Sequence, residues 1–204
     1  MNTVTPVKEP FSAMEMYMAA VRMVPAMAGL VGNAMTKRVK KQTIERIMLA
    51  VTEVNGCEVC SYAHTKMALK AGLSQEEINA MLSASGEHVP EDEAVAIFFA
   101  QHYAESKGKP DRASYERFMD TYGKKEGRAM LDAIQMMMYA NITGLPISAL
   151  LARFRKKPYA KSTLIREIVM ILLTPVVTIL AIPHAIINAI TFRRRLRFSA
   201  YEPE

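Results

Sequence analysis

Helix stop signals divide the first 155 residues into segments of helix length, and no other feature limits the fold as strongly. Between these signals apolar residues recur at helical spacing, as they do over 43–54. Asn55-Gly56 follows that segment, and glycine supplies the positive φ needed just past a helix end. No stretch before residue 165 shows the sustained alternation typical of a strand. We therefore expect an all-α fold, with an antiparallel helical domain over about residues 12–155.

Glycine, proline and capping residues predict where the individual helices begin and end. A first helix over about 13–30 is expected to break at Pro25 or to end before Gly32. Ser74 and Glu77 have the spacing of a capping box, which marks a helix start. The other predicted helices cover 58–70, about 90–106, 111–122 and 124–142, with Gly123 between the last two and a further boundary at Thr143-Gly144-Leu145-Pro146.

The C-terminal segment 156–204 differs in kind from the rest of the chain. Residues 168–192 contain no acidic or basic side chain except His184, and as one helix they would span about 37 Å, enough to cross a hydrocarbon core of about 30 Å. Pro175 and Pro183 would kink such a helix. Basic residues that suit anionic headgroups flank it on both sides: Arg153, Arg155, Lys156, Lys157, Lys161 and Arg166 before it, and Arg193, Arg194, Arg195 and Arg197 after it.

This pattern predicts a C-terminal hydrophobic helix or helical hairpin that serves as a membrane anchor or an oligomerisation arm. A membrane helix would span the bilayer or lie on it, and a shallow hairpin would fold at the two prolines. The alternative is a helix that packs against other subunits in a soluble oligomer.

Charge is distributed unevenly, although the net charge is +6. Residues 1–150 carry 16 basic and 17 acidic side chains, whereas residues 151–204 carry 10 basic and 3 acidic ones. Because the first 150 residues are nearly neutral, their charge gives no reason to expect nucleic-acid binding. Half of all residues are apolar, which predicts a sizeable core and argues against general disorder.

Two cysteines three residues apart, Cys57 and Cys60, are the sharpest chemical feature. A secreted domain stapled by disulfides would use more cysteines, and the N-terminal residues do not have the pattern of a cleaved signal peptide. Two thiols at i and i+3 at a helix start can form a disulfide and reopen it, since the helix N-terminus favours a thiolate. The thiolate acts as nucleophile, and the second thiol resolves the product as a disulfide.

Two further residues add acid–base chemistry to this pair. His64 follows Cys60 by four residues, so on a helix the two side chains share one face, and an imidazole can take a thiol proton near neutral pH. Glu45 lies on the preceding helix, which the intervening turn would bring back beside the cysteines. Its carboxylate would orient the imidazole or relay protons, and Glu53 is a nearby competitor for that role. Asn141 could reach the same site from a neighbouring helix.

The pattern of these residues continues with Ala71-Gly72-Leu73-Ser74 at the start of the next helix. Over roughly residues 20–150 the chain resembles the carboxymuconolactone decarboxylase / AhpD-like superfamily, and most of all its alkylhydroperoxidase branch. The resemblance implies an AhpD-like all-α fold that assembles as trimers or hexamers. It also implies a thiol peroxidase without a cofactor or metal, which reduces a hydroperoxide substrate and is reset by an external dithiol reductant.

The resemblance also implies a role for each site residue. Cys60 would attack the peroxide, Cys57 would resolve the product, and His64 with Glu45 would relay protons. One departure is Val59, because the best-known members carry a histidine at this position and many others carry an aromatic residue. The decarboxylase branch generally lacks the cysteine pair, so decarboxylation fits this sequence poorly.

Two other functions are open from the sequence. Cys57, Cys60 and His64 have metal-ligand spacing, and Glu45 could be a fourth ligand of a metal-binding module. Alternatively, the protein is a membrane-associated interaction or assembly protein on an AhpD-like fold. Because a working dithiol needs a reducing compartment, we expect a cytoplasmic protein, at the cytoplasmic face of the membrane if the C-terminal segment binds there.

Overall fold

The computed structural model describes residues 10–83, 88–191, 196 and 198–199. Within these residues the chain forms seven α-helices, one 3₁₀ helix and no strand, so the expected all-α fold is confirmed. The α-helices are α1 (Ala13–Thr36), α2 (Lys41–Asn55), α3 (Glu58–Ala71), α4 (Gln75–Leu82), α5 (Ala94–Glu105), α6 (Arg112–Phe154) and α7 (Leu164–Ile190), and the 3₁₀ helix η1 covers Glu91–Glu93.

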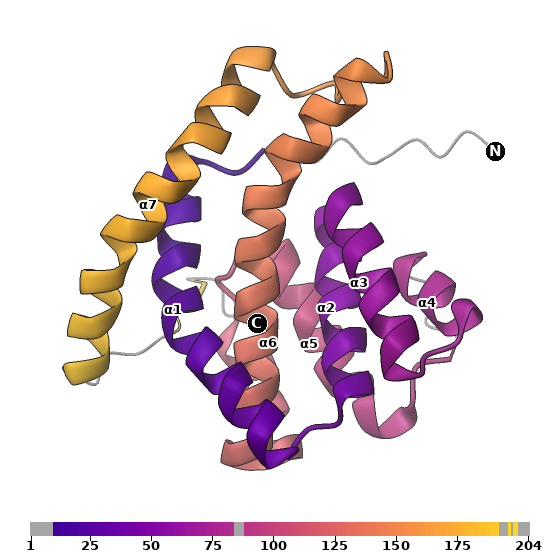
Figure 1. Cartoon of the computed structure of the whole chain (residues 1–204). Coiled ribbons are helices and arrows are strands. Elements are labelled where there is room, and N and C mark those ends of the chain that lie inside the picture. The colour runs from indigo at the N-terminus through magenta and orange to yellow at the C-terminus, as the bar shows by residue number, and fades with distance from the viewer. Residues whose placement is uncertain (1–9, 84–87, 192–195, 197, 200–204) are drawn as a thin grey trace.

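Helix α6 is the central element of the fold. It packs against α1, α2, α3, α5 and α7, and α1 lies between α6 and α7 (Figure 1). On the other side of α6, helix α2 contacts α3, α4 and α5. Fully buried side chains from several of these helices, among them Met16, Leu49, Tyr103 and Ile134, belong to one continuous core. That core fixes α3 against α2 and α6, which together build the candidate site.

Short-range signals place the helix that carries the cysteines. Gly56 ends α2 with a φ of 70°, and Gly72 ends α3 with a φ of 96°, both as predicted. The predicted capping box is also present, because the Ser74 hydroxyl accepts from the backbone N–H of Glu77 while the Glu77 carboxylate accepts from the backbone N–H of Ser74. These sharp helix ends keep α2, α3 and α4 in contact with one another.

Of the two boundaries predicted within the span of α6, one is present in the structure and one is not. Gly123 has non-helical dihedral angles, with φ 69° and ψ 171°, so the division at this residue is confirmed. The boundary predicted at 143–146 is wrong, because the helix continues through the proline for two more turns. Tertiary packing outweighs the local cost of the proline, since buried residues lie beyond it at Ser148, Ala149 and Ala152.

Helix α1 also continues where the sequence predicts an end. It passes through Pro25 and beyond Gly32 to Thr36, so the predicted break and the predicted earlier end are both wrong. Because α1 is enclosed by α6 and α7, packing along its length offsets the helix-breaking residues. At Gly29 the approach to α6 is so close that the Asp132 side chain fills the space of a Cβ atom.

The apolar C-terminal segment forms a single helix, α7, which contains both prolines. The prediction of a long hydrophobic helix is therefore confirmed, and the alternative of a hairpin is wrong. Polar contacts join α7 to its neighbours: the Tyr17 hydroxyl lies 2.9 Å from Nδ1 of His184, and Nε of Arg153 donates to Glu167 at 2.7 Å. The division of the chain near residue 155 stays a prediction. The flanking residues Phe192, Arg193, Arg194, Arg195 and Arg197 lie outside the described residues.

Three of the described helices, α1, α6 and α7, are long and apolar enough to cross a membrane by length and composition. Helix α7 is the least buried of the three, and only one side of it packs against α1 and α6. Its other side carries large exposed apolar residues, including Ile165, Leu172, Val176, Ile179 and Ile187.

Candidate active site

The two cysteines form a disulfide at the start of α3, with 5.3 Å between their Cα atoms. Cys57 is the N-cap residue of this helix, and Cys60 lies in its first turn. Both side chains are buried, with Cys57 1% exposed and Cys60 8% exposed. The pair therefore lies where the N-terminal end of a helix dipole can stabilise a thiolate once the disulfide is reduced.

Helix α6 packs directly on the disulfide through Gly144. A Cβ atom at this position would lie 2.7 Å from Sγ of Cys60 and 2.8 Å from Sγ of Cys57, which is closer than side chains approach. Only glycine therefore fits opposite the two sulfurs. The sequence analysis did not identify this residue as part of the site, because Gly144 was assigned to a predicted helix boundary.

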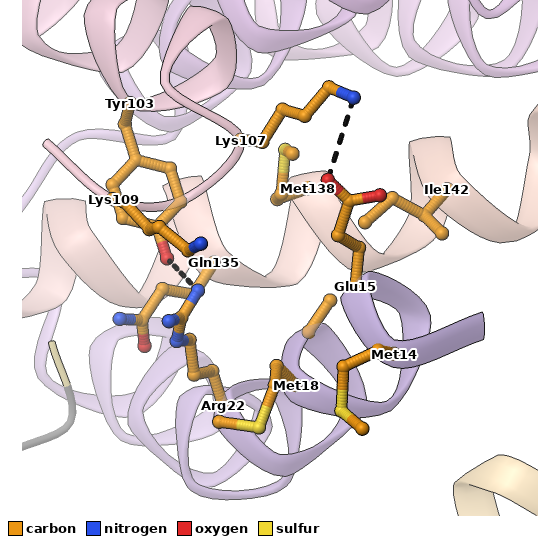
Figure 2. A pocket seen from close by; sticks show the side chains of 11 residues that line it. Met14, Glu15, Met18, Arg22, Tyr103, Lys107, Lys109, Gln135, Met138 and Ile142 are labelled. Carbon is orange, nitrogen blue, oxygen red and sulfur yellow. Dashed lines mark hydrogen bonds and ion pairs between the residues drawn. The ribbon is translucent and has the colours of Figure 1, made fainter. Parts of the chain in front are cut away.

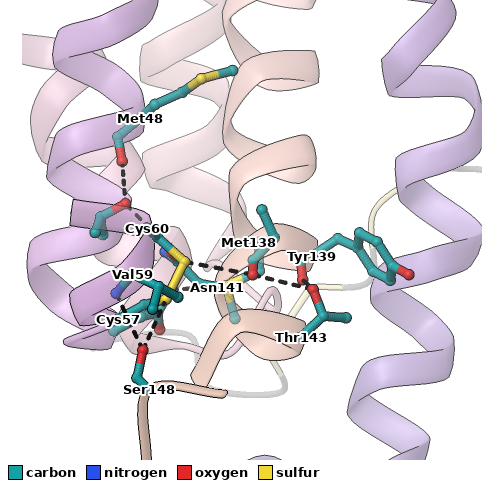
Figure 3. Close-up of a disulfide and its surroundings, with 12 residues drawn as sticks. Met48, Cys57, Val59, Cys60, Met138, Tyr139, Asn141, Thr143 and Ser148 are labelled. Carbon is teal, nitrogen blue, oxygen red and sulfur yellow. Dashed lines mark hydrogen bonds between the residues drawn. A yellow bond between two sulfur atoms is a disulfide. The ribbon is translucent and has the colours of Figure 1, made fainter. Parts of the chain in front are cut away.

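Ser148, one turn further along α6, completes the contact between the two helices. Its hydroxyl oxygen accepts from the backbone N–H of Val59 at 3.2 Å and lies 3.9 Å from Sγ of Cys57 (Figure 3). The serine thus satisfies one of the free N–H groups in the first turn of α3, which Cys57 does not cap itself. On the other side of the pair, Sγ of Cys60 lies 3.6 Å from the carbonyl oxygen of Ala140. No sequence signal pointed to Ser148.

Glu45 and His64 meet beside the start of α3, as the turn between α2 and α3 led us to expect. Oε2 of Glu45 lies 3.0 Å from Nδ1 of His64, and the exposed fractions of the two side chains are 3% and 14%. A carboxylate at this distance holds Nδ1 as the donor, which leaves Nε2 of a neutral imidazole free to accept a proton. The competitor Glu53 is not the partner of the imidazole in this contact.

His64 lies on the same helix as the two cysteines, but its imidazole does not contact their sulfur atoms through a hydrogen bond in the described residues. Proton exchange between them would therefore pass through a water molecule or the substrate. The described part of the chain also contains no three His, Cys, Asp or Glu side chains placed to hold a metal ion, so its geometry gives the metal-binding alternative no support.

Asn141 of α6 lies among the residues around the disulfide, and it is fully buried (Figure 3). Its Oδ1 accepts from the Thr52 hydroxyl at 3.4 Å, while its Nδ2 has no hydrogen-bond partner within the described residues. A buried amide N–H without a partner is costly, so this donor is available to a group that enters the site.

Comparison with known proteins identifies the part of the chain that holds most of this site. Residues 22–97 match the sequence model of the carboxymuconolactone decarboxylase family, and this segment contains both cysteines, His64 and Glu45. A search of curated proteins finds no match to the chain, and a search of solved structures finds none. The family match ends before α6, so Gly144 and Ser148 lie outside it, and it does not distinguish between branches. Over residues 22–97 the chain is therefore similar to the carboxymuconolactone decarboxylase family, which includes AhpD-like peroxidases.

Proposed function

We propose that the protein is a thiol-dependent peroxidase that reduces hydroperoxides through a Cys57/Cys60 dithiol–disulfide cycle. The observation that carries this proposal is the disulfide at the start of α3 together with His64 of the same helix, which is paired with Glu45 of α2. A reversible disulfide stores two electrons, and an imidazole oriented by a carboxylate transfers protons near neutral pH. Similarity of residues 22–97 to a family that includes AhpD-like peroxidases supports the same chemistry.

In the first step the thiolate of Cys60 attacks one oxygen of the hydroperoxide. The O–O bond breaks, a sulfenic acid forms on Cys60, and the leaving alkoxide takes a proton to become an alcohol. His64, oriented by Glu45, accepts the thiol proton and returns it to the leaving group. Cys60 is the better candidate for attack because its side chain is 8% exposed, against 1% for Cys57.

In the second step the thiol of Cys57 attacks the sulfenic acid. The S–S bond forms, the S–O bond breaks, and water leaves with the proton of Cys57. An external dithiol then reduces the disulfide by thiol–disulfide exchange and is itself oxidised. One turnover thus converts a hydroperoxide and a dithiol into an alcohol, water and a disulfide, and a reducing cytosol suits the supply of that dithiol.

Trapping the sulfenic acid tests the assignment of the two thiols. The reduced Cys57→Ser variant is treated with one equivalent of peroxide and a sulfenic-acid reagent, and the adduct is located by mass spectrometry. We expect an adduct on Cys60, because the thiol that would resolve it is missing. The matched Cys60→Ser variant is expected to give no adduct.

Equal adduct formation in both variants would remove the distinction between attacking and resolving thiols. Absence of any adduct in either variant, with the remaining thiol of each titrating as free, would contradict the peroxidase proposal. The segment similar to the carboxymuconolactone decarboxylase family would then serve a disulfide reductase or an assembly protein.

A second property is carried by the exposed side of α7: we infer that it docks on an anionic membrane surface. The helix leaves a row of large apolar side chains uncovered, and its N-terminal flank is basic, with Lys156, Lys157 and Lys161 in the preceding loop. Apolar residues favour the acyl boundary, and lysines near the surface are attracted to anionic headgroups. The competing occupant of this surface is a second copy of the chain, in the trimers or hexamers expected from the sequence.

Vesicle flotation separates these two occupants. Wild-type protein is expected to float with vesicles rich in anionic lipid and to lose binding when Ile179, 66% exposed on α7, is replaced by glutamate. Leu69→Glu, at an exposed leucine of α3, is the matched control and is expected to bind normally. If the wild type stays off the vesicles as a trimer or hexamer that Ile179→Glu dissociates, α7 is an oligomer interface.

A further inference from the structure

A cavity of about 110 Å³ lies between α1, α5 and α6, beside the loop that joins the last two. Gln135, Met138 and Ile142 line it from α6 (Figure 2). Gly144 and Ser148 of the same helix instead contact the disulfide. At 100° per residue, these two groups project from different faces of α6. The cavity therefore lies on a different face of α6 from the disulfide, although Met138 is near both (Figures 2 and 3).

Arg22 of α1 places a buried positive charge in this cavity. Its side chain is only 8% exposed. Its Nη1 donates to the hydroxyl oxygen of Tyr103 at 3.4 Å, and none of the carboxylates in the described residues forms an ion pair with it. Buried guanidinium groups are normally paired with an anion. Arg22 is therefore a cation whose counter-charge the described part of the chain does not supply.

Gln135 provides a second unsatisfied group at the same place. It is 1% exposed, and neither Nε2 nor Oε1 has a hydrogen-bond partner within 3.5 Å among the described residues, although the amide is close enough to the Tyr103 hydroxyl to act on its pKa. The amide and the guanidinium lie beside each other in the cavity (Figure 2). A buried amide without a close hydrogen-bond partner is destabilising, so it indicates a ligand that supplies both an acceptor and a donor.

The backbone leaves room around these groups at Gly108. This residue has a φ of 80°, and a Cβ atom there would lie 2.5 Å from Nη1 of Arg22 and 3.3 Å from the hydroxyl oxygen of Tyr103. Burial raises the pKa of Tyr103, so its hydroxyl stays protonated and can donate. Any side chain at position 108 would therefore crowd the donors.

The charged residues at the edge of the cavity also favour an anion. Lys107 and Lys109 line it, and among the residues that the structure describes Glu15 is the only acidic one that does so. Burial raises the pKa of Glu15, but hydrogen bonds from Ser12 and the charge of Lys107 together lower it, so the carboxylate is ionised. Its Oε1 lies 3.5 Å from Nζ of Lys107, which leaves Arg22 and Lys109 as excess positive charge around the cavity.

We propose that this cavity binds a short hydroxycarboxylate, an acid of a few carbon atoms with a hydroxyl beside its carboxylate. The planar carboxylate matches the fork of the Arg22 guanidinium and accepts from Nε2 of Gln135. The hydroxyl of the ligand donates to Oε1 of the same amide, and its alkyl part packs on Met18 and Ile142. A cavity of about 150 Å³ holds benzene, so this smaller one suits a molecule of the size of lactate.

Calorimetric titration of the full chain with lactate, propionate and inorganic phosphate, at matched ionic strength, tests this proposal. We expect lactate to bind at least tenfold more tightly than propionate, which lacks the hydroxyl, and phosphate to bind no better than propionate. Arg22→Met is expected to abolish lactate binding, whereas Lys125→Gln, at an exposed lysine of α6, is expected to leave it unchanged.

Gln135→Leu keeps the test decisive if the Arg22 variant does not fold. This change removes an unsatisfied buried amide, so the free protein should be at least as stable as the wild type. Lactate binding should nevertheless fall at least tenfold. No lactate binding by the wild type, equal binding of lactate and propionate, or undiminished binding by Gln135→Leu would each overturn the proposal.

Discussion

Replacing Gly144 by alanine is expected to destabilise the protein, although alanine is the better helix former. The new Cβ would lie 2.7 Å and 2.8 Å from the two sulfurs, whereas ordinary contacts begin at 3.4 Å, so α6 or α3 must move by about 0.7 Å. The disulfide fixes both sulfurs, so neither can move away independently. Overpacking of this kind costs about 1–3 kcal/mol, which opposes a gain of about 1 kcal/mol from helix propensity.

Gly32→Ala is the matched control for this change. Gly32 also lies inside a helix, but a Cβ atom there would meet nothing within 4 Å. Its alanine variant therefore gains helix propensity without overpacking, and the two variants should differ by about 1–3 kcal/mol in the free energy of unfolding.

Urea unfolding of the oxidised proteins measures this difference. The chain has no tryptophan, so helical circular dichroism is the suitable signal. In a parallel thermal melt, a difference of 1 kcal/mol in the free energy of unfolding corresponds to a shift of about 2–4 °C in Tm for a chain of this size. If Gly144→Ala stabilises the protein as much as Gly32→Ala does, the close contact between α6 and the disulfide does not exist.

Four further substitutions test other parts of the structure. His64→Gln and Glu45→Gln should each lower the rate of peroxide reduction by about 10²–10⁴-fold while the disulfide still forms, as stopped-flow kinetics and thiol counting would show; unchanged rates would exclude the proton relay. Arg46→Met should cost about 3–5 kcal/mol in urea unfolding, because it leaves the buried Glu93 carboxylate without the partner now 3.0 Å away; a loss below 1 kcal/mol would contradict this. Hydrogen bonds from Ser114 hold the pKa of Asp111 below its ordinary value, so the folded state binds fewer protons at this group than the unfolded state. Its contribution to stability is complete above about pH 5 and is lost as pH falls through the folded pKa, so the stability advantage over Asp111→Asn should shrink between pH 5 and 3.

Local signals in the sequence predicted those parts of the fold that local interactions determine. Gly56, Gly72 and Ser74 act through their own backbone angles or through residues three positions away, so the ends of α2 and α3 and the start of α4 lie where expected. Pro25 failed as a boundary because contacts of α1 with α6 and α7, distant in sequence, outweigh the local preference.

The same distinction applies to the candidate site. Helix α3 carries Cys57, Cys60 and His64. Glu45 lies on the preceding helix, joined to α3 by a single turn, so sequence spacing alone could place the four residues together. Gly144 and Ser148 approach the cysteines from a helix about ninety residues later in the chain, where nothing in the spacing relates them to the site. The sequence around Gly144, which includes Pro146, even pointed to a helix end.

Steady-state peroxide consumption with a dithiol reductant shows whether the Cys57/Cys60 pair reduces hydroperoxides. Wild-type protein, Cys60→Ser and Cys57→Ser would be compared at equal concentration, with hydrogen peroxide and an alkyl hydroperoxide as substrates. We expect turnover by the wild type that disappears in Cys60→Ser and stalls after one equivalent in Cys57→Ser. Turnover by Cys60→Ser at the wild-type rate, or no turnover by a fully reduced wild type with either peroxide, would contradict this expectation.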